Sequence, residues 1–341
     1  MRAVGRFILV AILYVISATN AHAASAKETF ANRDDVALFV TEMSQQHGFD
    51  AAKLATLLAE TVSLPSVVQL MQPPVASPAN SWVAYRERFI EPKRIAAGRK
   101  FMSRFEDALT RAETGYGVPR EIIAAIIGVE TIYGRNMGRV NTLAALTTLA
   151  FDYPPRAELF RYELSEFLLM ARDAKRDPHS YKGSFAGALG LPQFLPSSIR
   201  KYAVDFDNDG IIDIAGNAID AIGSVANFLN AHGWQPGAPI AITVMVSGDN
   251  LAAILGNGID PFFLPSTFEK LNCFIAPVGA DRMPSSFPDL PAALLDFTST
   301  NSPTEYRLGY QNFYVITRYN RSRFYAAAVM DLAAELKMQN D

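Results

Sequence analysis

The sequence contains very little thiol or imidazole chemistry. It has one cysteine, Cys273, and four histidines among its 341 residues. A single cysteine excludes an internal disulfide framework and a zinc site built on several thiolates. The histidines show no spacing typical of a metal site; they are His22, His47, His179 and His232. Any catalysis by this chain must therefore depend mainly on carboxylates.

Neither sign of charge is in large excess. The chain has 31 Lys and Arg against 34 Asp and Glu, which gives a formal net charge of -3. It thus lacks the basic excess of a nucleic-acid-binding protein, and we expect no nucleic-acid partner. Because 50% of the residues are hydrophobic, the chain can bury a large core, which argues against disorder. At roughly 100 to 200 residues per domain, the length suggests about two structural units.

The first 23 residues have the layout of a secretory signal peptide. Arg2 and Arg6 form a positive start, residues 7–16 an apolar run, and residues 21–23 a small-residue cleavage pattern. The alternative, an uncleaved anchor, fits less well because the apolar run is short and its downstream flank is polar. The apolar run is not followed by a cysteine, the residue to which a lipoprotein anchor would be attached. We therefore expect cleavage near Ala23, no stable membrane anchor afterwards, and a freely soluble protein in the periplasm.

Helical spacing dominates the sequence up to about residue 230. Residues 33–62 predict two short helices, and residues 82–112 predict a longer one. From residue 119 to about 230 one helical pattern follows another. A glycine-rich stretch at residues 183–190 and an acidic turn at residues 205–210 interrupt this region. The fold class is therefore mainly α.

The pattern changes after residue 235. Residues 240–246 predict a strand, and the prolines between residues 261 and 291 indicate a small mixed β insertion. Residues 312–319 alternate and are rich in β-branched and aromatic side chains, which predicts another strand before a final helix capped by Ser322. After the signal peptide, the predicted units are an N-terminal helical segment at 24–80, a helical core at 81–235, the β insertion at 236–305, and a strand and helix returning to the core at 306–341.

A glutamate ends the most apolar helical segment of the chain. Residues 122–129 are apolar nearly all round, which predicts a buried helix, and Glu130 follows directly. Gly134 can terminate the helix, which places Glu130 in a last turn where the helix dipole disfavours an anion. Burial and dipole would both raise the pKa of Glu130, as a general acid for glycosidic cleavage requires. The alternative is a glutamate that reaches solvent or pairs with Arg135 or Arg139.

The acidic turn matches most of a calcium-binding loop. Alternate aspartates and a glycine occupy the first part of the pattern: Asp205, Asp207, Asp209 and Gly210. Ile211 is placed to offer a backbone carbonyl. The usual closing glutamate is replaced by Gly216, and Asp220 could close the site from a longer loop. The alternative is an Asx-rich surface turn. Because the three acids repel one another without a cation, we favour a structural calcium ion.

Two further segments suit a ligand. Residues 183–194 combine small residues, which let backbone approach a ligand closely, with hydroxyl and amide groups suited to sugars. Close packing of a loop against a helix would explain the same residues. Tyr319, Asn320 and Tyr325 bracket a predicted strand-to-helix turn, and they would also fit a simple core and turn. The sequence contains no phosphate-loop or dinucleotide fingerprint, and we expect no organic cofactor.

Taken together, four ordered segments resemble the lytic murein transglycosylase B family. They are residues 128–135, 183–198, 221–227 and 317–320. The resemblance covers about residue 30 to the C-terminus, without the lipoprotein cysteine of membrane-bound members. It implies a mainly α, α+β fold with a lysozyme-like helical catalytic core, an additional α domain and a small β domain. The substrate it implies is the β-1,4 bond between N-acetylmuramic acid and N-acetylglucosamine in peptidoglycan.

By that resemblance Glu130 is the sole catalytic acid and base. It would protonate the glycosidic oxygen and then accept the proton of the muramyl 6-hydroxyl, which closes a 1,6-anhydro ring without water. The second carboxylate of ordinary glycosidases is then unnecessary. The resemblance also implies substrate contacts for Tyr85, Arg156, Ser184, Gln193, Asn320 and Tyr325. The calcium ligands that it implies are Asp205, Asp207, Asp209, Ile211 and Asp220.

The chain also departs from the family pattern, and two rival hypotheses stay open. Phe228 stands where members can carry a tyrosine, which removes one hydroxyl near the substrate. One rival is a hydrolytic muramidase that uses Asp152 or Glu158 with a trapped water. The other is a non-catalytic protein that binds peptidoglycan. The expected partners are peptidoglycan glycan strands, with cell-wall synthesis or remodelling proteins as further candidates.

Overall fold

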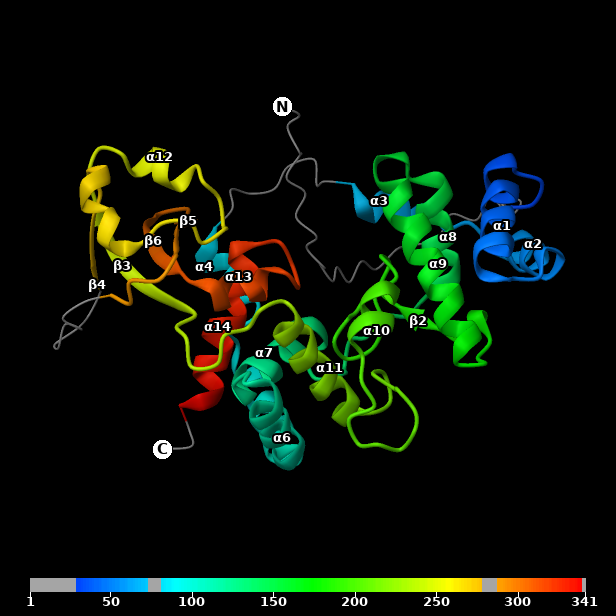
Figure 1. Cartoon of the computed structure of the whole chain (residues 1–341), viewed down its shortest axis with the longest axis horizontal. Coiled ribbons are helices and arrows are strands. Elements are labelled where there is room, and N and C mark those ends of the chain that lie inside the picture. Colours follow the sequence, from blue (N-terminus) through cyan, green and yellow to red (C-terminus); the bar gives the residue numbers. More distant parts are fainter. Residues whose placement is uncertain (1–28, 73–80, 278–286, 339–341) are drawn as a thin grey trace.

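The computed structural model describes residues 29–72, 81–277 and 287–338. The predicted signal peptide at residues 1–23 lies outside these ranges. None of the described helices combines the length and the apolarity that a membrane span needs. Figure 1 shows a helical group at one end of the molecule, a sheet at the other and a helical core between them. The predicted fold class, mainly α with a small β part, is confirmed.

The helical group at one end comes from two separate parts of the chain. It consists of α1 (Asp34–His47), α2 (Ala51–Glu60), α3 (Pro65–Met71), α8 (Thr142–Asp152) and α9 (Ala157–Asp173), with the 3-10 turns η1 (Pro154–Arg156) and η2 (Pro178–Ser180) beside them. The two helices predicted within residues 33–62 are confirmed by α1 and α2. These elements bury one hydrophobic cluster, which includes Phe39, Leu58, Leu146, Leu164 and Phe167. The N-terminal helices therefore share a core with helices from the middle of the chain.

The central core consists of helices that share one hydrophobic cluster with α7. They are α4 (Trp82–Glu87), α5 (Pro92–Arg104), α6 (Glu106–Tyr116), α7 (Arg120–Thr131), α10 (Pro196–Tyr202), α11 (Ala218–Ala231), α13 (Gln311–Thr317) and α14 (Arg323–Lys337). The segment predicted as one helix at residues 82–112 is broken into three. Pro92 opens α5 because its missing N–H is tolerated only in a first turn. Phe105, in a non-helical conformation, ends α5 and begins α6.

The described residues between 241 and 309 form a β subdomain. Its strands are β3 (Ala241–Ser247), β4 (Phe274–Pro277), β5 (Ala293–Ser299) and β6 (Ser302–Gly309), with the short helix α12 (Leu251–Leu255) and the 3-10 turns η3 (Pro265–Thr267) and η4 (Glu269–Leu271). The sheet is antiparallel with the order β4-β3-β6-β5. The strand predicted at residues 240–246 is confirmed by β3. A small core of its own, with Val244, Phe268, Cys273, Leu294 and Leu308, fills the subdomain.

One predicted strand is wrong. Residues 312–319 were expected to be extended, but residues 311–317 form α13. Asn312, Phe313, Val315, Ile316 and Thr317 are all buried in this helix. A segment that is buried on nearly every side is apolar at most positions, so alternation no longer separates strand from helix. Packing in the core therefore favours a helix here, although the side chains prefer a β-strand.

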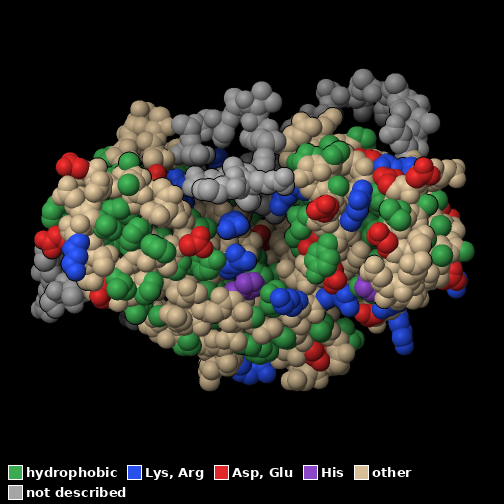
Figure 2. Space-filling model, turned by 45° about the horizontal axis from the view of Figure 1, so that its top comes forward, with side chains coloured by type: hydrophobic (Ala, Val, Ile, Leu, Met, Phe, Trp, Pro, Cys, Tyr) green, Lys and Arg blue, Asp and Glu red, His purple; other side chains and the backbone are tan. Residues whose placement is uncertain are grey.

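A second, very small sheet lies at the start of α8. Its strands, β1 (Val140–Asn141) and β2 (Lys182–Gly183), are antiparallel, with Val140 opposite Gly183. It connects the residues after α7 to the start of the glycine-rich stretch. Figure 2 shows one face of the molecule with a hollow near its middle, where several Lys and Arg side chains gather.

Candidate active site

The apolar helix α7 carries Glu130 to its C-terminal end. Residues 122–129 are all buried, and Glu130 lies in the last turn with its side chain only partly exposed. Three successive residues after the helix, Ile132, Tyr133 and Gly134, have left-handed φ angles of 51°, 56° and 87°. The predicted position of Glu130 at a helix end is therefore confirmed.

The turn after α7 requires the glycine at position 128. Tyr133 folds back on the helix, and a Cβ at Gly128 would lie 2.4 Å from the hydroxyl oxygen of Tyr133. A Cβ at Gly98 in α5 would lie 2.2 Å from the same atom. The Tyr133 ring thus occupies space that only two glycines leave open. This packing fixes where α7 stops and hence where Glu130 points.

Among the residues that the structure describes, Tyr325 forms a hydrogen bond to the Glu130 side chain. Its hydroxyl donates to Oε1 of Glu130 at 2.6 Å, although the two residues are 195 positions apart in sequence. Tyr325 is 3% exposed and lies in the first turn of α14, where the Ser322 hydroxyl accepts its backbone N–H. The Tyr325 ring stacks on that of Tyr319 at 6.3 Å between centroids. One predicted substrate-contact residue therefore touches the predicted acid.

Burial raises the pKa of Glu130 to about 7, and the hydrogen bond from Tyr325 lowers it by a smaller amount. The charge of Glu130 acts in turn on three phenols. Burial is the main cause that raises the pKa of Tyr85, Tyr319 and Tyr325, and the nearby Glu130 carboxylate raises each further. These phenols stay neutral at ordinary pH. Glu130 is therefore an acid that is about half protonated near neutrality, in a wall of neutral tyrosines.

The alternative partners of Glu130 are not in place. Arg135 and Arg139 are both exposed, and no ion pair joins either of them to Glu130. Asp152, a candidate second carboxylate, has both oxygens occupied elsewhere: one accepts from Arg33 at 2.6 Å and the other from Ser63 at 2.9 Å. The other candidate, Glu158, is exposed at the start of α9. Within the described residues, a second carboxylate makes no contribution to the pKa shift of Glu130.

The glycine-rich stretch is tied to the residues around Glu130. The hydroxyl of Thr131 donates to the carbonyl of Leu191 at 2.9 Å, and the hydroxyl of Tyr319 donates to that of Pro192 at 2.7 Å. The Gln193 amide donates to the carbonyl of Met137 at 3.2 Å. Three tethers thus hold residues 191–193 against the end of α7 and the turn after α13.

The structure places two of the predicted substrate-contact residues, Tyr85 and Tyr325, in interaction with Glu130. Ser184 and Gln193 are partly exposed on the glycine-rich stretch, of which residues 191–193 are tethered. Asn320 directly follows Tyr319, between α13 and α14. Arg156 lies in η1, next to α9, and the described contacts do not connect it to Glu130. Tyr319, predicted beside Asn320 at a turn that suits a ligand, is not among the implied substrate contacts, although its hydroxyl holds the glycine-rich stretch through Pro192.

Three predicted calcium ligands form a group. The carboxylates of Asp205, Asp207 and Asp209 offer oxygens that all lie within 4.8 Å of one another. Calcium binds oxygen at about 2.3 to 2.6 Å, so oxygens on opposite sides of one ion are roughly 4.6 to 5.2 Å apart. Hard carboxylate oxygens are also the ligands that calcium prefers. The donor set therefore fits one calcium ion.

The two other predicted ligands are placed differently. Asp220 is fully buried, and its carboxylate accepts the backbone N–H groups of Phe206 and Asp213, each at 2.8 Å. It thus joins the two ends of the acidic loop and is not part of the carboxylate group within the described residues. Ile211 is 64% exposed, and its N–H donates to Asp209 at 2.8 Å.

The fold and the site together define a class. A mainly helical core with an apolar helix that ends in one partly buried, protonatable glutamate is that of a lysozyme-like protein. Residues 31–334 match the family model described as "Transglycosylase SLT domain". The chain belongs to this family.

Known relatives match the chain over most of its length. Membrane-bound lytic murein transglycosylase B of Escherichia coli (strain K12) is 44% identical over 314 residues, which cover 89% of this chain and 82% of the relative. The crystal structure of soluble lytic transglycosylase SltB1 from Pseudomonas aeruginosa is 42% identical with a TM-score of 0.82, and covers 90% of this chain and 99% of that one. The Escherichia coli lytic transglycosylase Slt35 in complex with calcium is 42% identical with a TM-score of 0.79, over 92% and 96%.

Proposed function

We propose that this protein is a lytic transglycosylase that cleaves peptidoglycan with Glu130 as its acid and base. Family membership and the lytic transglycosylases among its relatives support the enzyme class and the peptidoglycan substrate. The observation that carries the role of Glu130 is its burial at the end of α7 beside the Tyr325 hydroxyl, and this burial raises its pKa to about 7. A group that must first give and then take a proton works best when both protonation states are accessible near the working pH.

The reaction follows from one carboxyl group. Neutral Glu130 donates its proton to the bridging oxygen as the bond from that oxygen to C1 of the muramyl residue breaks. The resulting carboxylate accepts the proton of the muramyl 6-hydroxyl as that oxygen bonds to C1 and closes the 1,6-anhydro ring. No water enters, so a second carboxylate is not required. Because Tyr325 donates to Oε1, the other oxygen of Glu130 is left for the proton transfers.

The surrounding residues would bind and orient the sugar chain. We assign substrate contacts to Tyr85, Arg156, Ser184, Gln193, Asn320 and Tyr325. The partly exposed ring of Tyr85 can stack on a sugar face, and hydroxyl and amide groups can form hydrogen bonds to the polar substituents of the sugar. The three tethers of residues 191–193 support this assignment for the glycine-rich stretch, since they limit its movement beside Glu130.

A calcium ion would have a structural role in the acidic loop. The grouped oxygens of Asp205, Asp207 and Asp209 support the site, as does the calcium complex of Slt35. Ile211 and Asp220 stay proposed as the remaining ligands. When bound, calcium would neutralise the repulsion among the three acids and hold the loop in one conformation.

We also propose export to the periplasm. The layout of residues 1–23 supports a cleaved signal peptide, and the substrate lies outside the cytoplasm. The partners would be peptidoglycan glycan strands and, through them, cell-wall synthesis or remodelling proteins.

Product analysis tests the proposed reaction. Purified peptidoglycan is digested with wild type, with Glu130→Gln, and with Glu121→Gln as a control at the other end of α7. We expect 1,6-anhydromuropeptides from wild type and Glu121→Gln, and a loss of at least about a thousandfold in their release by Glu130→Gln. Muramyl products with a reducing end would mean a hydrolase. Binding without any product would mean a non-catalytic protein.

A further inference from the structure

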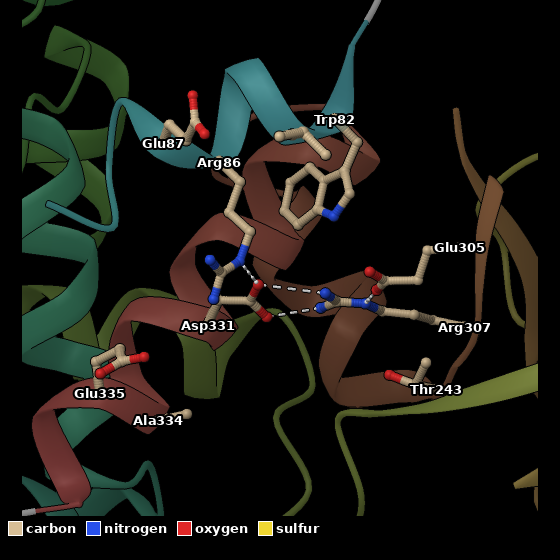
Figure 3. A pocket seen from close by; sticks show the side chains of 10 residues that line it. Trp82, Arg86, Glu87, Thr243, Glu305, Arg307, Asp331, Ala334 and Glu335 are labelled. Carbon is tan, nitrogen blue, oxygen red and sulfur yellow. Dashed lines mark hydrogen bonds and ion pairs between the residues drawn. The ribbon is translucent and has the colours of Figure 1, made fainter. Parts of the chain in front are cut away.

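A partly buried ion network lies in a pocket of about 540 Å³. Asp331 in α14 accepts from two guanidinium groups, at 2.6 Å from Nε of Arg86 and 2.8 Å from Nη1 of Arg307 (Figure 3). Arg307 also pairs with Glu305. Arg307 is 4% exposed, and the side chain of Asp331 is 11% exposed. Glu130 does not line this pocket.

The network joins three segments that are distant in sequence. Arg86 lies in α4, Arg307 in β6 of the β subdomain, and Asp331 in α14. Two of the three segments also carry a tyrosine that interacts with Glu130. Tyr85 directly precedes Arg86 in α4, and Tyr325 lies in the same helix as Asp331. Asp331 therefore bonds the element that carries Tyr85 to the element that carries Tyr325.

Packed rings connect the network to Tyr85. The Arg307 guanidinium lies over the Trp82 ring at 5.3 Å, and Trp82 stacks on Tyr85 at 6.4 Å between centroids. Phe324, next to Tyr325, packs edge-on against Tyr85 at 5.5 Å and against Trp82 at 5.5 Å. A continuous series of contacts therefore runs from the charges to the tyrosines at Glu130.

We propose that Asp331 is a positioning residue for catalysis, which holds Arg86 and Arg307 and thereby fixes Tyr85 and Tyr325 against Glu130. The β subdomain then takes part in the reaction through Arg307 without touching the substrate. This inference rests on the proposed role of Glu130. A buried ion pair alone is weak evidence for stability, because the cost of removing charges from water offsets their attraction. The position of this network between two walls of the site is what gives it a role.

The expected consequence concerns water around Glu130. In the described part of the chain, the titratable groups that interact with Glu130 are the phenols of Tyr85, Tyr319 and Tyr325. Asp331 faces two guanidinium groups, and three further carboxylates line the same pocket: Glu87, Glu305 and Glu335. If the tyrosine wall loosens, water reaches Glu130. Its burial, the main cause of the raised pKa, then weakens, and the pKa falls toward its ordinary value.

The test measures anhydromuropeptide release from soluble glycan strands as a function of pH. For Asp331→Asn we expect kcat to fall on the order of tenfold, with KM changed less than about twofold, because positioning acts on the transition state. The alkaline limb, where Glu130 loses its proton, should move down by on the order of 1 pH unit. Arg86→Met should show the same changes more weakly, and Arg86→Lys, which keeps the positive charge, should recover part of them.

Glu166→Gln is the control. It removes an ion pair of similar length, 2.8 Å to Arg200, that joins α9 to α10 in another part of the molecule. If Asp331→Asn and Arg86→Met lose thermal stability but keep the wild-type kcat and alkaline limb, the network is only structural and the inference is wrong. An equal shift in Glu166→Gln would also overturn it.

Two further outcomes separate the inference from its premise. Should Asp331→Asn fail to fold, Arg86→Met decides, since the Arg86 side chain is 39% exposed and its loss leaves the pair between Asp331 and Arg307 intact. If the wild-type profile has no alkaline limb, or Glu130→Gln keeps full activity, it is the assignment of Glu130 that fails.

Discussion

Carboxyl groups lie in opposite environments in two regions of this molecule. At the end of α7 one glutamate is surrounded by apolar residues and tyrosines, and burial raises its pKa to about 7. In the acidic loop three aspartates lie near one another with their side chains in contact with solvent. The first environment favours the protonated form of a single acid, whereas the second places several exposed acids close together. We therefore propose that the same chemical group serves proton transfer where it is buried and cation binding where it is exposed.

The largest expected effect concerns the free energy of unfolding, which the ionised, buried Glu130 lowers. The pKa of Glu130 is raised from 4.5 to about 7 in the folded protein. A raised folded-state pKa contributes stability that is fully present below about pH 4.5 and lost as pH rises through 7. Glu130→Gln stays neutral, so it should gain stability over wild type between pH 5 and pH 8, by at most about 3 kcal/mol. Urea unfolding at both pH values measures this gain.

Glu121→Gln is the matched control for that measurement, because Glu121 lies partly exposed in the first turn of the same helix. Its stability should follow that of wild type at both pH values. Equal pH dependence in wild type and Glu130→Gln would mean that Glu130 is not perturbed by burial, and the contrast between the two regions would be lost.

Tyr325→Phe tests how the buried acid is tuned. The hydrogen bond from Tyr325 lowers the pKa of Glu130, and a phenylalanine ring keeps the burial while removing that bond. The pKa should therefore rise further, which moves the alkaline limb of activity to higher pH, opposite to the shift expected for Asp331→Asn. The rate should fall about tenfold, because the carboxylate formed during the reaction loses a donor.

Tyr319→Phe provides the comparison for this variant. Tyr319 stacks on Tyr325, but its hydroxyl donates to the carbonyl of Pro192. Its loss should leave the position of the alkaline limb unchanged. A downward shift in Tyr325→Phe would show that its hydroxyl does not stabilise the ionised form of Glu130.

The smallest expected effect concerns the exposed acids. Saturating calcium should raise the Tm of wild type by on the order of 5 °C, because it binds the folded loop only. Asp207→Ala should lose most of this rise while keeping its activity at low temperature. Asp177→Asn, an exposed acid outside the loop, should respond like wild type. Equal calcium responses in all three proteins would remove the metal site.

The parts of the fold that depend on local signals could be predicted from the sequence. The apolar run at residues 122–129 gave the helix and the place of Glu130, and the alternate aspartates gave the acidic loop. The conformation of residues 311–317 could not be predicted, because burial on all sides removes the period that separates strand from helix. The sharing of a core between α1, α2 and α8 depends on contacts far apart in sequence.

The site shows the same division. The family pattern pointed to Tyr325, but that its hydroxyl bonds Glu130 depends on α14 packing against α7. Tyr319 and Asp331 carry no local signal for their partners, since Pro192 and Arg86 lie in other elements. Asp220 was predicted as a calcium ligand, and its two backbone partners became visible only in the folded loop. Its role as a ligand stays a prediction.

The most direct test of the account is a titration of the Glu130 carboxyl group in the folded protein. Carbon NMR of protein with labelled glutamate, assigned by comparison with Glu130→Gln, would follow this one group through pH. We expect a pKa of about 7, as burial at the end of α7 requires. A pKa near the ordinary 4.5 would contradict the claim that this acid holds its proton for the sugar.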